Sequence, residues 1–232
     1  MNTCASFTPS SELMAQVTAR RGRLHAFEHL EPARTALLVV DMQNSFVRQS
    51  GHAWVPAAAA TCPTINRTAQ ALRELGGQVV WVLNTFTEDS LQSWSHFHQE
   101  LWSTDGVALR SASMCQGSEG HALYADLRPA PGDLHLPKTR FSAFIQGSSS
   151  LHEQLQSLGI NTLLVAGTAT SVCCESTARD AMMLNYRTVM LSDGCSSFTA
   201  ESHAATLSNF LLHFGDVQTC DEAIEHLRQG AR

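Results

Sequence analysis

Three side chains that could together perform nucleophilic catalysis each follow a short apolar run. Asp41 comes directly after the run 37–40, and Lys138 and Cys173 follow two later runs. A carboxylate at the end of an apolar strand is desolvated and can act as a base with a raised pKa. A lysine near it keeps the carboxylate charged and favours a thiolate and an oxyanion. These residue types predict covalent catalysis by a cysteine.

Cys173 lies where a turn of small residues passes into a predicted helix. The first turn of a helix is the positive end of its macrodipole, where N–H groups favour a thiolate and could hold an oxyanion. Cys174 is rotated by about 100° around that helix, so the two thiols cannot face one pocket equally. Each candidate also has a structural alternative: Asp41 as a turn cap, Cys173 as a buried thiol, and Lys138 as solvated surface.

Alternating strand and helix patterns predict the elements that position these residues. The pattern favours a doubly wound, mainly parallel six-stranded α/β sheet with helices on both faces. In such a sheet ligands bind beyond the C-terminal ends of the strands, where the three candidates fall. The expected strands are 35–40, 78–83, 134–136, 161–166, 187–191 and 214–219, and the expected helices are 63–75, 148–158 and 173–184.

The segment 84–133 contains no convincing strand, and a stretch of that length in a compact domain is usually functional. We expect it to form a lid or pocket wall. Trp94, Phe97 and Leu101 are spaced i, i+3 and i+7, which predicts a short amphipathic helix. Its apolar side could anchor the segment to the core or face a substrate.

Composition limits the possible functions. A length of 232 residues favours one domain, 1–232, with residues 1–30 as an N-terminal extension. A net charge of −6 argues against nucleic acid as a partner, and the longest apolar run is far below the ~20 residues that span a membrane. Residues 1–23 lack the apolar region of a secretory signal, and the seven cysteines form no regular framework, so we expect a cytoplasmic protein.

In their order along the chain, these motifs resemble the isochorismatase-like cysteine hydrolases, from residue 35 to 219. The resemblance rests on the segments 38–46 and 167–173 together with the intervening lysine. It implies a catalytic triad of Asp41, Lys138 and Cys173.

The same resemblance implies the details of the nucleophile turn. A non-proline cis peptide is expected between Thr168 and Ala169, and the N–H groups of Ala169 and Cys173 are expected to form an oxyanion hole. Asp41 would take the Cys173 proton, and the thiolate would attack a carbonyl carbon.

The segments 132–144 and 173–177 further resemble the ureidoacrylate amidohydrolases. Asn84, Phe86 and Phe141 fall at positions that line the pocket in that branch, so the resemblance implies that they bind substrate. Here Phe86 stands in place of a Trp and Phe141 in place of a Tyr. The implied partner is a small amide or ureido compound, cleaved with ammonia release through a thioester or thiocarbamate.

Other readings of the motifs are kept as alternatives. A vinyl-ether hydrolase of the isochorismatase type is one. Members of that type generally lack a nucleophilic cysteine, so the presence of Cys173 counts against this alternative. Maleamate, biuret and N-carbamoylsarcosine are alternative substrates. An inactive α/β interaction scaffold is a third reading, and it predicts loss of a triad residue, whereas none is lost.

The remaining expectations concern cofactors, charged side chains and assembly. His96 and His98 would point to different sides of a helix, and no Gly-x-Gly-x-x-Gly follows the first strand, so we expect neither a metal nor a cofactor. Arg140 and Arg179 are also considered for binding a substrate carboxylate. Arg179 is spaced to pair with Glu175, whereas Arg140 is nearer the expected pocket. The resemblance implies a homodimer or homotetramer.

Overall fold

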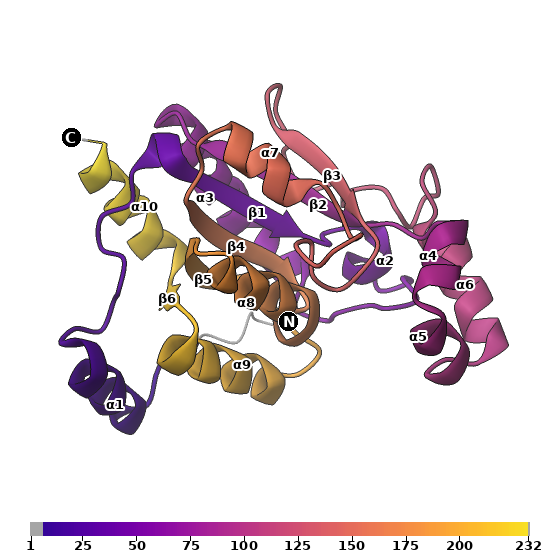
Figure 1. Ribbon diagram of the computed structural model, residues 1–232, viewed down its shortest axis with the longest axis horizontal. Coiled ribbons are helices and arrows are strands. Elements are labelled where there is room, and N and C mark those ends of the chain that lie inside the picture. Colours follow the sequence, from indigo (N-terminus) through magenta and orange to yellow (C-terminus); the bar gives the residue numbers. More distant parts are fainter. Residues whose placement is uncertain (1–6, 232) are drawn as a thin grey trace.

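The computed structural model describes residues 7–231, so Cys4 and the start of the predicted N-terminal extension lie outside the described residues. Within that range six strands form one parallel sheet in the order β3-β2-β1-β4-β5-β6 (Figure 1). This confirms the predicted fold class. The strands are β1 (Thr35–Val40), β2 (Gln78–Asn84), β3 (Leu134–Lys138), β4 (Thr162–Thr168), β5 (Arg187–Ser196) and β6 (Asp216–Gln218).

Helices cover both faces of the sheet, with α7, α8 and α9 on one face and α3 and α10 on the other (Figure 1). No helix in the range 7–231 is long and apolar enough to cross a membrane. The helices are α1 (Ser11–Arg21), α2 (Asn44–Val47), α3 (Cys62–Glu74), α4 (Glu88–Ser93), α5 (Ser95–Glu100), α6 (Thr104–Met114), α7 (Leu151–Ser157), α8 (Glu175–Met183), α9 (Ala200–His213) and α10 (Cys220–Gly230), with a π-helical turn at Thr170–Cys174.

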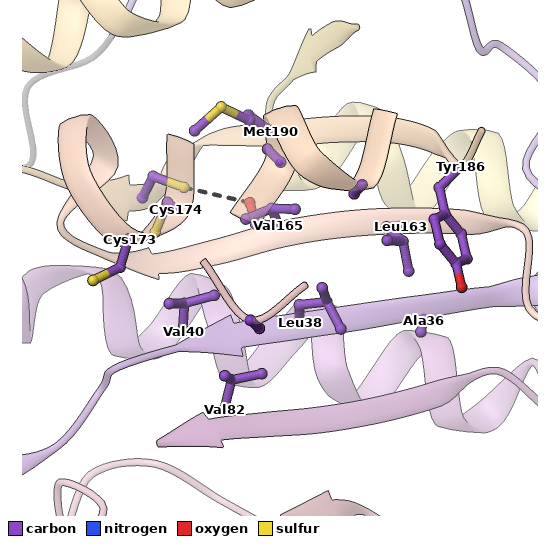
Figure 2. Close-up of a cluster of buried hydrophobic side chains, with 14 of the residues drawn as sticks. Ala36, Leu38, Val40, Val82, Leu163, Val165, Cys173, Cys174, Tyr186 and Met190 are labelled. Atoms are coloured by element: carbon purple, nitrogen blue, oxygen red, sulfur yellow. Dashed lines mark hydrogen bonds between the residues drawn. The ribbon is translucent and has the colours of Figure 1, made fainter. Parts of the chain in front are cut away.

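Strand β1 is buried on both faces, which explains its unbroken apolar sequence. Ala36, Leu38 and Val40 point into the core beneath α7 to α9, and Leu37 and Val39 point into the core beneath α3 and α10. Figure 2 shows the first of these sets facing residues of the neighbouring strands. Because both cores share β1, the end of this strand is fixed in position from two sides.

The N-terminal segment is held to β6 by the buried carboxylate of Asp216. This group accepts hydrogen bonds from the Phe27 N–H at 3.1 Å and from Gln218 Nε2 at 3.1 Å, and it lies 3.2 Å from His25 Nδ1. Burial alone would raise the pKa of Asp216, but the hydrogen bonds with His25, Gln218 and Phe27 outweigh it and lower that pKa. The extension is therefore an integral part of the packed domain as far as it is described.

Helices α4, α5 and α6 gather at one end of the molecule, beyond the ends of β1 and β2 (Figure 1). A short helix, α5, is present where the spacing of Trp94, Phe97 and Leu101 predicts one, but of the three residues only Phe97 lies within its bounds. Trp94 adopts a φ of −128° and ψ of 42°, which interrupts the helix between α4 and α5, and Leu101 is 73% exposed. The Trp94 and Phe97 rings stack with centroids 4.0 Å apart.

Asp133 fastens the end of this segment to the sheet. Its carboxylate accepts hydrogen bonds from Arg73 Nη2 at 2.6 Å, from Trp81 Nε1 at 2.7 Å and from the Ala130 N–H at 2.9 Å. The segment 84–133 therefore leaves the sheet at β2 and is anchored again beside the same strand.

Gly167 lets the ends of β1 and β4 approach closely. It pairs with Val40 in the parallel register and has a φ of +114°. A Cβ atom at this position would lie 2.1 Å from the Val40 carbonyl oxygen. A residue with a side chain here would push apart the two strands whose ends carry Asp41 and Cys173.

We predict that Gly167→Ala destabilises the protein much more than Gly22→Ala. Both glycines have a positive φ, but a Cβ at Gly22 meets nothing within 4 Å, whereas one at Gly167 meets backbone. We expect a loss of roughly 3 kcal/mol or more at Gly167 and about 1 kcal/mol at Gly22, measured by urea unfolding. Equal losses would show that the close approach of β1 and β4 is not required.

Candidate active site

The three catalytic candidates meet where the strand order reverses, between β1 and β4. Asp41 is the first residue after β1, Lys138 is the last residue of β3, and Cys173 lies in the π-helical turn after β4. Figure 2 shows Cys173 beyond the ends of β1 and β4, on the side of Val40. This is the position at which open parallel sheets bind ligands.

Asp41 and Lys138 form an ion pair in which both side chains are 0% exposed. Lys138 Nζ donates to Asp41 Oδ2 at 2.8 Å and to the Arg140 carbonyl oxygen at 3.1 Å. Burial raises the pKa of Asp41, and the Lys138 charge opposes that rise. Burial alone would lower the pKa of Lys138, but Asp41 and Cys173 outweigh it and raise that pKa. The lysine therefore stays charged.

Lys138 is the single lysine of the chain, so the other 14 of its 15 basic Lys and Arg side chains are arginines. An ammonium is a compact point charge with three rotatable donors, whereas a guanidinium is a rigid planar fork. The compact group can serve Asp41 and Cys173 from one atom in a confined space. This explains why a lysine is found here in a chain that otherwise uses arginine.

Cys173 is 5% exposed, and its thiol lies close enough to interact with both Asp41 and Lys138. Burial raises its pKa, the Asp41 charge raises it further, and Lys138 lowers it. Desolvation thus outweighs the effect of the helix start, which by itself would favour a thiolate. Burial therefore favours the protonated thiol form of Cys173, beside the buried Asp41 carboxylate.

Ala169 presents a backbone donor beside the nucleophile. The Thr168–Ala169 peptide bond is cis. The Ala169 carbonyl oxygen accepts hydrogen bonds from the N–H groups of Val172 at 3.0 Å and Cys174 at 3.2 Å. Its own N–H donates none within the described residues, so that donor is available for a bound oxyanion. The roles of the Ala169 and Cys173 N–H groups as oxyanion donors both remain predictions.

A cavity of about 350 Å³ opens onto Cys173. Of the three predicted substrate-binding residues, Asn84 and Phe141 line the cavity. Phe86 does not line it and instead packs with Phe46 and Met114. Trp94 and Phe97 do not line the cavity, but both rings pack against Phe141. The cavity is lined by Phe46, His52, Ala53, Asn84, Trp102, Arg110, Phe141, Ala169, Val172, Cys173 and Phe198.

Several residues that line or support this cavity are not predicted by the sequence. Gln43 positions Asn84, because its side chain accepts from the Asn84 N–H at 2.8 Å and donates to the Asn84 carbonyl oxygen at 3.1 Å. Arg110 and Trp102 reach the cavity from the segment 84–133, and His52 reaches it from the loop after α2. The one available signal was that Arg110 is the single charged residue in 107–114.

The histidines considered as metal ligands are separated. His96 is exposed and contacts Glu100 Oε1 at 2.6 Å, whereas His98 is buried against aromatic rings. Across the part of the chain that the structure describes, no three His, Cys, Asp or Glu side chains are grouped so that they could hold a metal ion.

This chain matches a known protein family and is similar to several known proteins. The isochorismatase domain family matches residues 35–222. The ureidoacrylate amidohydrolase RutB of Agrobacterium fabrum strain C58 is 31% identical over 215 residues, covering 87% of this chain and 93% of the relative. A cysteine hydrolase from Pseudomonas syringae pv. phaseolicola 1448A shares the fold with a TM-score of 0.74 at 23% identity, over 87% of this chain and 95% of the other.

A third similar protein is an N-carbamoylsarcosine amidase from Thermoplasma acidophilum. Its structure aligns with a TM-score of 0.64 at 25% identity, covering 81% of this chain and 97% of that one. The chain belongs to the isochorismatase family. Within this family it is an amidohydrolase, an enzyme that hydrolyses a C–N bond other than a peptide bond.

We predict that Lys138→Met slows alkylation of Cys173 by iodoacetamide about tenfold or more at pH 7. Without the ammonium, the pKa values of Asp41 and Cys173 both rise, since Lys138 lowers each of them. Mass spectrometry of the Cys173 peptide separates this reaction from alkylation of the exposed Cys115. Arg67→Met, which breaks an exposed ion pair with Asp221, is the control. An unchanged rate would show that Lys138 does not influence the nucleophile.

Proposed function

We propose that this enzyme is a cysteine-dependent amidohydrolase that cleaves a ureido or amide C–N bond of a small molecule and releases ammonia. The observation that carries this proposal is the buried Asp41–Lys138 pair, in contact with the Cys173 thiol at the base of the cavity. Covalent hydrolysis needs a nucleophile with a base beside it, and a fixed positive charge favours the ionised forms of both groups. The names of similar proteins, a ureidoacrylate amidohydrolase and an N-carbamoylsarcosine amidase, support a ureido group as the target.

Acylation begins when Asp41 takes the Cys173 proton and the sulfur attacks the carbonyl carbon. The carbonyl oxygen becomes an oxyanion that the Ala169 and Cys173 N–H groups stabilise, each such donor contributing roughly 2.7 to 4 kcal/mol in other hydrolases. The C–N bond then breaks, and the nitrogen leaves as ammonia with the proton from Asp41. For a ureido substrate the product on the enzyme is a thiocarbamate of Cys173.

Deacylation uses the same groups with water in place of the thiol. Asp41, again ionised, removes a proton from water, and the hydroxide adds to the thiocarbamate carbon. The C–S bond breaks, the sulfur regains its proton from Asp41, and a carbamate leaves. One carboxylate thus acts first as base and then as acid in each half of the reaction, and the Lys138 charge favours its ionised form before each proton transfer.

We predict that the purified enzyme releases ammonia from at least one compound in a panel of ureido acids, carbamoyl amines and simple amides. Cys173→Ala abolishes this release, because no other thiol lines the cavity among the described residues. Cys115→Ala, which removes an exposed thiol, leaves it unchanged. Turnover that survives in Cys173→Ala, or hydrolysis of isochorismate without any amide hydrolysis, would contradict the proposal.

We predict a pH profile of kcat/KM with one acid limb and no alkaline limb below pH 9. Activity needs ionised Asp41, whose pKa burial raises above the ordinary 3.8, so the limb lies above pH 3.8 and activity rises with pH through it. The pKa values of Cys173 and Lys138 are raised above their ordinary 9.0 and 10.5. A rise in activity that follows thiol ionisation near pH 9 would mean that Asp41 is not the base.

A further inference from the structure

Arg110 brings a positive charge into the wall of the cavity. Its side chain comes from α6, the residue is 7% exposed, and the guanidinium is near enough to Cys173 for the two groups to interact. Among the residues that line the cavity, it is the single one with a charged side chain.

Arg110 has no counter-charge in the described part of the protein. Its Nε is buried and donates no hydrogen bond, and no Asp or Glu of residues 7–231 is placed to pair with it. The arginines considered from the sequence differ, since Arg179 pairs with Glu175 at 3.0 Å and Arg140 donates to Ser93 at 2.9 Å. Neither of those two lines the cavity.

Aromatic rings compensate only part of the cost of burying this charge. The Arg110 guanidinium carbon lies 4.2 Å from the centroid of Trp102, 5.5 Å from that of Phe86 and 5.7 Å from that of Phe97. Cation–π contacts of this kind are weaker than a charge-assisted pair with an anion. The buried Nε of Arg110 is left without a hydrogen bond, and a buried polar group without a hydrogen bond is costly.

His52 lines the same cavity and is also unsatisfied. Both of its ring nitrogens are buried and make no hydrogen bond within residues 7–231. Burial, together with the nearby Arg110 charge, lowers the pKa of His52 to about 4, so the ring is neutral at pH 7. A neutral imidazole offers one donor and one acceptor. The wall thus presents a cation with an unpaired buried Nε and a neutral polar ring, and His52 has no hydrogen-bond partner among residues 7–231.

We propose that Arg110 binds a carboxylate of the substrate, with His52 beside it as a polar contact. A guanidinium fork matches a carboxylate in geometry and charge, which makes Arg the usual residue for this role. The inference rests on the proposed function and narrows it, because the substrate class becomes a small amide or ureido acid. Arg110 is then the residue that selects acids over neutral amides.

The test compares two probes with the same ureido group, 3-ureidopropionate and propylurea, of which only the first has a carboxylate. Binding is measured by calorimetry to Cys173→Ala protein, so the result does not depend on turnover. We expect 3-ureidopropionate to bind about 10- to 100-fold more tightly than propylurea, the range for hydrogen bonds to charged groups. Arg110→Met in the same background removes the preference, and Arg110→Lys keeps part of it.

Arg179→Met is the matched control, because Arg179 also lies over an aromatic ring, that of Phe214, yet is outside the cavity. It leaves the preference intact. Equal binding of the two probes, or a preference that survives in Arg110→Met, would overturn the inference. A preference that depends on Arg110, combined with no ammonia release by the unmodified enzyme, would instead count against the proposed function.

Discussion

The ion pair between Asp41 and Lys138 is the interaction on which the rest of the site depends. Two fully buried charges are stable only when each satisfies the other in good geometry, and here one Nζ–Oδ2 contact of 2.8 Å joins the ends of two strands, β1 and β3. Removing either partner would leave an uncompensated charge inside the sheet. The same pair sets the proton balance of Cys173, so the stability of this edge and the reactivity of the thiol are linked.

Close packing of the strand ends provides the geometry for that pair. Gly167 permits the approach of β4 to β1, and Gln43 holds the backbone of Asn84 at the end of β2. Asp133 returns the long segment between β2 and β3 to the sheet. With its two ends fixed in this way, that segment can contribute Trp102 and Arg110 to the cavity without strands of its own.

The sheet and the meeting of Asp41, Lys138 and Cys173 at one of its edges could be predicted from the sequence, because both depend on local patterns. Apolar runs located all six strands, and Asp41 and Lys138 were found from their positions after such runs. Arg110 and His52 could not be found in this way. Their side chains are buried with nitrogen atoms that make no hydrogen bond, and this burial results from contacts between segments that are distant in the sequence. Spacing alone does not show that the helix expected from Trp94, Phe97 and Leu101 is limited to Ser95–Glu100, because the backbone turns at Trp94 and Leu101 is exposed. The rise in the pKa of Cys173 could not be seen in its position at a helix start, because desolvation depends on tertiary burial.

The protonated resting state of Cys173 has a consequence for the life of the enzyme under oxidising stress. Peroxides attack thiolates rather than thiols, and susceptibility follows both thiolate character and exposure. A buried thiol whose pKa is raised is therefore a poor target until a substrate is bound, when proton transfer to Asp41 creates the reactive form. Cys115 is exposed, unlike the other described cysteines, so among these oxidative damage would fall first on a sulfur that the reaction does not use.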